Sequence, residues 1–244
     1  MKKTILSNLE CFNDPEFKFN PTYHKYTYKG EEYDSVTRFI QKFHEPFKQD
    51  YWSNKKADEA GVPQQDILNE WKRLNDYANE IGTDTHQWIE DYYNQTWREI
   101  PSNLDLIHRI NKFNKVYAKQ LHKLEPIKFE VRVFSKKWKI AGMIDALFFY
   151  KSKIYIVDYK TNKEFTTDEN IKFKENLLPP FESFYKNHLN EYSIQISMYA
   201  LILKEWGFDI GGAYLLHIGP GDEEAQLHKC VNMIDILENH LIGL

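Results

Sequence analysis

The sequence predicts a single α/β domain in which a central mixed β-sheet is flanked by helices. Three apolar runs rich in β-branched and aromatic residues follow one another at about 126–135, 138–150 and 153–160. Runs with helical periodicity lie on either side of them, at 104–124 and 190–206. The first pattern is typical of strands and the second of amphipathic helices. Because the sequence has no internal repeat, low-complexity tract or linker, one domain over all 244 residues is the simplest organisation.

The first part of the chain predicts a short hairpin followed by a helix. Residues 24–34 alternate around a turn at Lys29-Gly30, and Ser35 is the expected N-cap of the next helix. A second, polar helix is expected over 48–61, because Gly61-Val62-Pro63 ends the helical pattern there.

Helical periodicity then continues from 64 to 97. Gly82 interrupts it, and Thr83 or Asp84 is expected to cap a second helical segment. We therefore expect residues 41–81 to form a helical addition and residues 82–218 to form the core.

The C-terminal part predicts an irregular segment, a strand and a last helix. Residues 163–185 are expected to be irregular, because Pro179-Pro180 excludes a regular element. Gly211-Gly212 precedes a strand at 213–218, and a final helix is expected over 223–244.

The composition is that of a globular chain from a reducing compartment. No apolar run approaches the roughly 20 residues needed to span a membrane, and the N-terminus lacks the apolar core of a signal peptide. The two cysteines, Cys11 and Cys230, lie far apart and form no metal-ligand spacing. We expect a cytoplasmic protein without a membrane partner; the sequence indicates no particular protein partner.

The net charge of −4 hides a basic window. Residues 108–139 contain ten Lys or Arg and only two acids, Glu125 and Glu130, so this window carries +8 and the rest of the chain −12. Such a stripe suits the phosphate backbone of a nucleic acid. A solvated helix face explains it equally well.

The most informative stretch is the hairpin that contains Asp145 and Asp158. If its turn is centred between Lys151 and Ser152, the two aspartates face each other across the strands, and Lys160 points to the same side. Facing carboxylates repel each other, and a bound hard cation removes that repulsion. The alternative is an ordinary solvent-facing ladder, but acids inside such apolar runs favour a metal site.

Glu130 is a further candidate for this site. If the preceding turn is centred between Lys137 and Trp138, Glu130 lies opposite Asp145. A slip of one residue places Glu130 on the opposite face of the sheet, and the length of the turn leaves both registers open.

Two helices carry polar pairs with a spacing of four residues. His86 and Glu90 form one pair, and Gln195 and Tyr199 form the other. Imidazole is a common metal ligand, although a lone helical histidine is more often structural. The second pair is either an ordinary helix boundary or an amide and a phenol over the site.

Together these residues resemble the PD-(D/E)xK nuclease superfamily, in its RecB-like exonuclease branch of phage and prophage type. The branch shows, in order, a GxxxH helix, a GxxD strand, a DxK strand and a QxxxY helix. Their counterparts are Gly82 to His86, Gly142 to Asp145, Asp158-Tyr159-Lys160 and Gln195 to Tyr199. Some members of the branch hold an iron–sulfur cluster with four cysteines, which this chain lacks.

The resemblance implies a restriction-endonuclease-like core and a role for each motif. His86, Asp145, Asp158 and the carbonyl of Tyr159 are implied ligands of one or two Mg²⁺ or Mn²⁺ ions. Lys160 is implied to orient or activate the attacking water and to stabilise charge on the phosphate. Gln195 and Tyr199 are implied to position Lys160 or the DNA. Glu130 and Glu90 remain candidates for the metal or its surroundings.

The resemblance also implies the function: a metal-dependent DNA exonuclease of a bacterial or phage-infected cell, acting in replication, recombination or repair. In the family, a helical segment can arch over the site so that single strands thread through it, and residues 41–81 are the candidate arch. The alternatives are a nuclease-fold DNA-binding subunit without catalysis and a structure-specific endonuclease.

Overall fold

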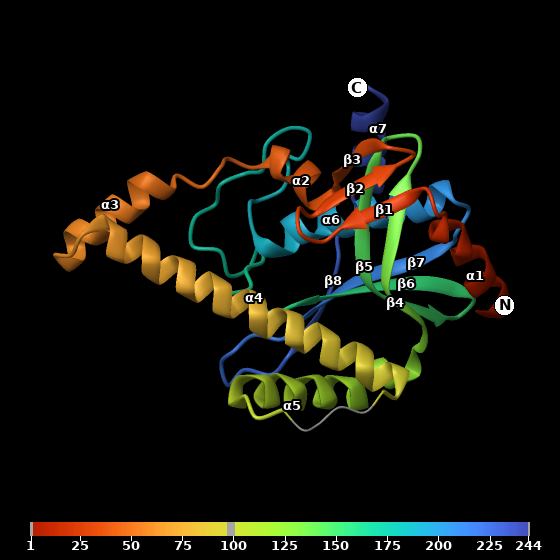
Figure 1. Ribbon diagram of the computed structural model, residues 1–244, viewed down its shortest axis with the longest axis horizontal. Helices are drawn as coiled ribbons and strands as arrows, with labels where there is room; N and C mark the ends of the chain where they lie inside the picture. Colours follow the sequence, from red (N-terminus) through yellow and green to blue (C-terminus); the bar gives the residue numbers. More distant parts are fainter. Residues whose placement is uncertain (1, 97–100, 244) are drawn as a thin grey trace.

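The computed structural model describes residues 2–96 and 101–243. Within them an eight-stranded mixed sheet forms the centre, in the order β1-β2-β3-β5-β6-β7-β8, with β4 paired to β5 (Figure 1). The strands are β1 (Phe17–Asn20), β2 (Lys25–Tyr28), β3 (Glu31–Ser35), β4 (Glu125–Ser135), β5 (Ile140–Tyr150), β6 (Lys153–Lys160), β7 (Ile210–His217) and β8 (Gln226–Lys229). The predicted fold class, a central mixed sheet with flanking helices, is confirmed.

Seven α-helices surround this sheet in the described part of the chain. They are α1 (Lys2–Leu9), α2 (Val36–Ile40), α3 (Gln49–Ala60), α4 (Gln64–Asn94), α5 (Leu104–Lys119), α6 (His188–Glu205) and α7 (Ile234–Ile242). Short 3₁₀ turns follow α1, α2 and α5, at Glu10–Asn13, Gln41–Phe43 and Leu121–Lys123. None of the described helices has the length and hydropathy needed to cross a bilayer.

The sheet is buried on both faces. On one face, α6 packs with Ile144 and Ile156 into a core that also includes β1–β3. On the other face, α4 and α5 pack with Phe148 and Val157 into a second core. Burial on both faces explains why the sequences of β5 and β6 are almost continuously apolar. The polar side chains within these strands therefore need a specific reason to be there.

The hairpin of β5 and β6 has the predicted register. Ala146 pairs with Val157, and Tyr150 pairs with Lys153. Lys151 and Ser152 form the turn with φ values of 46° and 67°. Two positive φ angles are typical of the two-residue turns that match the right-handed twist of a hairpin.

One edge of β5 is shared by two strands. β3 pairs in parallel with Ile140 and Ala141, whereas β6 pairs from Ala146 onwards; β4 occupies the other edge. Among the described strands, none pairs with residues 142–145 on the shared edge. Beside this stretch the side chain of Tyr199 from α6 packs over one face of β5, so close that a Cβ atom on Gly142 would be 2.6 Å from its Cε1.

α4 is one helix of 31 residues, so the predicted break at Gly82 is wrong. Thr83 does not cap a second helical segment. Its hydroxyl donates to the carbonyl of Asn79 at 2.9 Å, as the hydroxyl of a threonine does in a helix interior. Glycine costs a helix about 1 kcal/mol relative to alanine. Here its small size has a use, because a Cβ atom at 82 would lie 3.0 Å from Oγ1 of Thr161. The predicted helix end at residue 97 lies outside the described residues.

The predicted final helix over 223–244 is wrong at its start. Gln226–Lys229 form β8, which pairs with the edge of β7, and α7 begins only at Ile234. The last residue of the prediction, 244, lies outside the described residues. Strand β1 was not predicted from the sequence, and with it the sheet extends beyond residues 82–218 at both ends.

The other elements follow the sequence patterns. The Ser35 hydroxyl accepts from the amide of Arg38 at 3.0 Å and caps α2 as predicted. Gly61 ends α3 in the left-handed conformation. Residues 163–185 are irregular, with one isolated bridge between Asn176 and Tyr185. Figure 1 shows α3 and the first half of α4 projecting away from the sheet.

Candidate active site

The two aspartates of the hairpin lie where β5 and β6 separate. The ladder ends at Ala146 and Val157, one residue before the position at which Asp145 and Asp158 would pair. Beyond it the amide of Tyr159 donates to Oδ2 of Asp145 at 2.8 Å. The separation of the strands thus replaces a backbone pairing with a backbone-to-carboxylate bond, which holds Asp145 in a fixed orientation.

Lys160 joins Asp158 to helix α6. Its Nζ lies 2.7 Å from Oδ2 of Asp158 and donates to Oε1 of Gln195 at 3.3 Å. Gln195 Nε2 in turn donates to the hydroxyl of Tyr199 at 3.2 Å. This chain of contacts brings four of the predicted site residues together and restricts the position of the ammonium group.

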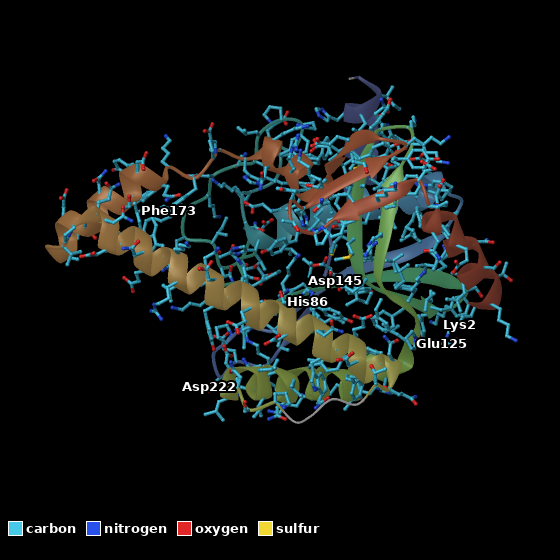
Figure 2. All side chains as sticks on the ribbon, in the orientation of Figure 1. Lys2, His86, Glu125, Asp145, Phe173 and Asp222 are labelled. Atoms are coloured by element: carbon cyan, nitrogen blue, oxygen red, sulfur yellow. The ribbon has the colours of Figure 1, made fainter. Side chains whose placement is uncertain are left out.

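His86 and Glu130 approach Asp145 from two other elements. His86 Nδ1 lies 3.5 Å from Oδ2 of Asp145, and its ring meets the edge of the Tyr159 ring at 5.6 Å. Figure 2 shows His86 on α4 directed at Asp145. Ligand atoms of His86, Glu130 and Asp145 all lie within 4.8 Å of one another.

Glu130 reaches this position through an irregularity in β4. Phe129 pairs with Ala146 and Val131 pairs with Ile144, which is the register that places Glu130 opposite Asp145. The φ angle of Glu130 is +47°, and such a conformation is uncommon for a residue with a side chain. Backbone strain of this kind gathers at functional sites, where the surrounding structure maintains it.

Two carboxyl groups of the site, those of Glu130 and Asp145, carry raised pKa values because they are buried among other acids. Burial, followed by the charges of Asp145, Glu90 and Asp158, raises the pKa of Glu130 to about 8. Burial and the charge of Asp158 raise the pKa of Asp145 to about 6, against the opposing effects of His86 and Lys160. Burial disfavours the charged form of Lys160, but the carboxylates outweigh it and raise the pKa of the ammonium group.

These donors fit a hard divalent cation. One imidazole nitrogen and two carboxylates lie within bridging distance, and Asp158 adds a carboxylate that is 2% exposed. Oxygen-rich donors with a histidine suit Mg²⁺ or Mn²⁺. The raised pKa values of Glu130 and Asp145 reflect burial first and neighbouring carboxylates second, and a bound cation would favour the ionised forms of both groups.

Two predicted site residues lie differently from the rest. Glu90 is one turn after His86, but its carboxylate accepts from Gln87 at 3.2 Å and is not part of the close group of candidate metal ligands formed by His86, Glu130 and Asp145. Tyr159 contributes its amide and its ring, as described above; its carbonyl remains an expectation from the resemblance.

Sequence reasoning missed Tyr192. The Nζ of Lys160 lies 4.3 Å from the centre of the Tyr192 ring, a cation–π contact. Tyr192 is three residues before Gln195 on α6 and so lies on the same helix face. This spacing was the signal in the sequence that could have identified it.

Arg109 belongs to the basic window of the sequence, but the structure shows that it is buried rather than exposed to a nucleic acid. It is 3% exposed, donates to the carbonyls of Thr161 (2.9 Å) and Ile218, and pairs with Asp105 at 3.0 Å. Lys112, at 5% exposed, donates to the carbonyls of Gly219 (2.7 Å) and Gly221. Both cations therefore hold the ends of β6 and β7 in place.

The basic window as a whole does not form one surface. Figure 1 places α5 and the turn between β4 and β5 on opposite sides of the molecule. At that turn, Lys139 pairs with Glu31 at 2.9 Å and Lys137 lies over the Trp138 ring. The excess of basic residues between 108 and 139 is therefore no evidence for a continuous track along DNA.

Comparison with known proteins identifies the family. The model of the PD-(D/E)XK nuclease superfamily matches residues 6–232. Because the match covers most of the chain, the chain belongs to this superfamily. The mixed sheet with its flanking helices is accordingly a restriction-endonuclease-like α/β fold, and the family implies a metal-dependent nuclease that acts on DNA.

Two other comparisons add little. No curated protein matches the chain. One solved structure, described as "Crystal structure of SSO0001", is similar over 57% of this chain and 59% of its own, at 14% identity and a TM-score of 0.26. The match thus spans less than two thirds of that chain, and at this TM-score it supports no argument.

Proposed function

We propose that this protein is a metal-dependent DNA exonuclease of the RecB-like, phage or prophage type. It acts on single-stranded DNA or on DNA ends, in replication, recombination or repair in a bacterial or phage-infected cell. One observation carries the proposal: Asp145, Asp158 and Lys160 meet where β5 and β6 separate, with His86 and Glu130 beside them.

His86, Asp145 and Asp158 are the proposed metal ligands, with Glu130 and the Tyr159 carbonyl as further candidates. Bound Mg²⁺ or Mn²⁺ ions would lower the pKa of a water molecule and offset negative charge on the phosphate. The amide of Tyr159 keeps Asp145 oriented for this task. Glu90 acts through the charge that it adds near Glu130.

Lys160 is the proposed catalytic cation. Its raised pKa keeps the ammonium group charged at neutral pH, so that it can stabilise negative charge on the phosphate or orient the attacking water. Gln195 positions Nζ by a direct hydrogen bond, and Tyr199 orients the amide of Gln195. Tyr192 covers the ammonium from another side.

The projecting arm, defined as α3 and the first half of α4, supports the preference for single strands. Aromatic side chains are exposed on it or just before it, among them Phe47 at 67%, Tyr51 at 60% and Tyr77 at 44%. Lys55 lies over the ring of Trp52 at 5.3 Å. Exposed rings next to cations suit the stacking of unpaired bases and contact with their phosphates.

The test is cleavage of end-labelled and circular DNA, each in single- and double-stranded form, with Mg²⁺, Mn²⁺ or EDTA. We expect metal-dependent release of nucleotides from linear single strands and no cutting of closed circles. Efficient cutting of circles would instead assign an endonuclease. Binding without cleavage under every metal condition would assign a DNA-binding subunit.

A further inference from the structure

A second feature of the molecule is a pocket of about 690 Å³ beside the candidate active site. It lies between the irregular segment 163–175, the start of α6 and the end of β7. Its volume is within the range of about 300–1,000 Å³ that is typical of small-molecule sites. None of the roles proposed above uses this pocket.

Three rings of the pocket lining, Phe165, His188 and His217, form what we call its floor. Phe165 stacks with His228 at 4.4 Å and contacts His217 at 5.0 Å. His188 stacks with Phe165 at 6.1 Å and with Tyr192 at 5.9 Å. Continuous aromatic contacts therefore extend from the floor of the pocket to Tyr192.

The same rings connect the pocket to the catalytic lysine. Tyr192 contacts Nζ of Lys160, and His217 pairs with Lys160 across the β6–β7 ladder. A DNA strand whose phosphate lies at Lys160 would thus run next to Tyr192, the ring that joins this lysine to His188 in the pocket lining.

Phe173 forms part of the pocket wall and is 80% exposed. Figure 2 shows it away from His86 and Asp145, on the side of the molecule from which the arm projects. The free surface of Phe173 is suited to stacking against a flat, unsaturated ring.

The charges in the pocket do not favour a simple phosphate site. The lining holds three lysines and four glutamates: Lys163, Lys172, Lys186, Glu164, Glu175, Glu191 and Glu223. Burial also lowers the pKa values of His188 and His217, so the floor is uncharged at neutral pH. A flat neutral ligand with amino groups fits such a lining, because carboxylates accept hydrogen bonds from the amino groups.

We infer that this pocket holds an unpaired nucleobase of the DNA strand being cleaved, stacked against Phe173 above the aromatic floor. The inference rests on the proposed nuclease function and deepens it. A base in a duplex is stacked and paired, so it enters the pocket only after it leaves the helix. The pocket thereby selects strands that are unpaired near the scissile phosphate.

The test uses single-stranded oligonucleotides that contain 2-aminopurine, whose fluorescence falls when the base stacks. Binding is measured in EDTA, where no metal-dependent cleavage occurs. We expect the wild type to quench the fluorescence, and Phe173→Ala to weaken binding about 5- to 150-fold, the range for losing one base–aromatic stack. Phe173→Trp should retain the quenching.

The matched control is Ile242→Ala, which removes another exposed apolar side chain (65%) on α7. It should bind as the wild type does. The inference is overturned if the wild type gives no quenching, if Phe173→Ala binds as tightly as the wild type, or if Ile242→Ala loses as much affinity.

Cleavage in Mg²⁺ or Mn²⁺ separates this inference from the proposed function. If the wild type binds and quenches but never cleaves, the nuclease proposal fails while the pocket assignment stands. If the wild type cleaves and Phe173→Ala has the same KM for single strands, the pocket assignment fails alone. A raised KM with an unchanged kcat supports both.

Discussion

The amide of Tyr159 donates a hydrogen bond of 2.8 Å to the carboxylate of Asp145, at the point where β5 and β6 separate. This contact links the two halves of the site, because Asp158 and Lys160 flank Tyr159 on β6. The geometry of the site therefore depends on the end of a strand ladder as much as on the identity of its side chains. The four predictions below test separate parts of this arrangement.

Replacing Lys160 by alanine should reduce cleavage by at least about 100-fold, because a positioned positive charge at the phosphate is lost. DNA binding should change only a few-fold, since other contacts carry most of the affinity. The measurements are single-turnover cleavage and fluorescence anisotropy. Lys153→Ala, an exposed lysine at the other end of β6, is the control and should cleave normally. Normal turnover by Lys160→Ala would remove this residue from the mechanism.

The stability of the metal-free protein should fall as the pH rises. The folded-state pKa of Glu130 is raised to about 8 and that of Asp145 to about 6, so the folded state binds more protons than the unfolded state. Their contribution to stability is fully present below the unfolded-state pKa values of 4.5 for Glu130 and 3.8 for Asp145, and it is lost as the pH rises through the folded-state values of about 8 and 6. Thermal unfolding in EDTA between pH 5.5 and 8.5 measures this trend.

Added Mn²⁺ should reverse this dependence of stability on pH. A cation binds the ionised carboxylates and therefore stabilises the folded state more at high pH. Glu130→Gln should make the melting temperature in EDTA less dependent on pH. An equally steep dependence in this variant would show that Glu130 does not titrate in the crowded site.

Gly142→Ala should destabilise the protein by about 1–3 kcal/mol, because the new methyl group overlaps the Tyr199 ring and forces a shift of α6 or β5. The same shift should slow cleavage, since Tyr199 orients Gln195 beside Lys160. Denaturant unfolding and cleavage rates test both effects. Gly221→Ala, whose methyl group would meet nothing within 4 Å, should leave stability nearly unchanged.

Arg109→Met should destabilise the protein by about 3 kcal/mol or more, because Asp105 and the carbonyls of Thr161 and Ile218 lose a buried cation. Urea unfolding measures the loss. Lys115→Ala, at an exposed position on the same helix, is the comparison and should change stability by less than about 0.5 kcal/mol. Equal effects of the two substitutions would contradict the internal role of Arg109.

Much of the site's framework could be predicted because it is local in sequence. Lys151 and Ser152 form a two-residue turn, and such a turn allows only one register between the apolar runs on either side. The two aspartates and Lys160 follow from that register. Gln195 and Tyr199 follow from the spacing of one helix.

Other features required contacts between distant parts of the chain. The glycine at position 82 suggested a helix break, but α4 continues through it, and the close approach of Thr161 explains why the residue there is small. The edge of β7 recruits residues 226–229 as β8, although their sequence also permits a helix. In the sequence, Arg109 belongs to the basic window. Its burial depends on hydrogen bonds to carbonyls that lie more than 50 residues further along the chain.

The sequence by itself therefore determined the fold class, the central hairpin and the identities of the acids and the lysine, because periodicity and turn chemistry act over short ranges. The tertiary structure decided how those residues meet. It separated β5 from β6 at the aspartates, turned Glu130 towards His86 and Asp145, and placed Tyr192 on Lys160. These outcomes depend on how helices pack against a sheet buried on both faces, which no local pattern specifies.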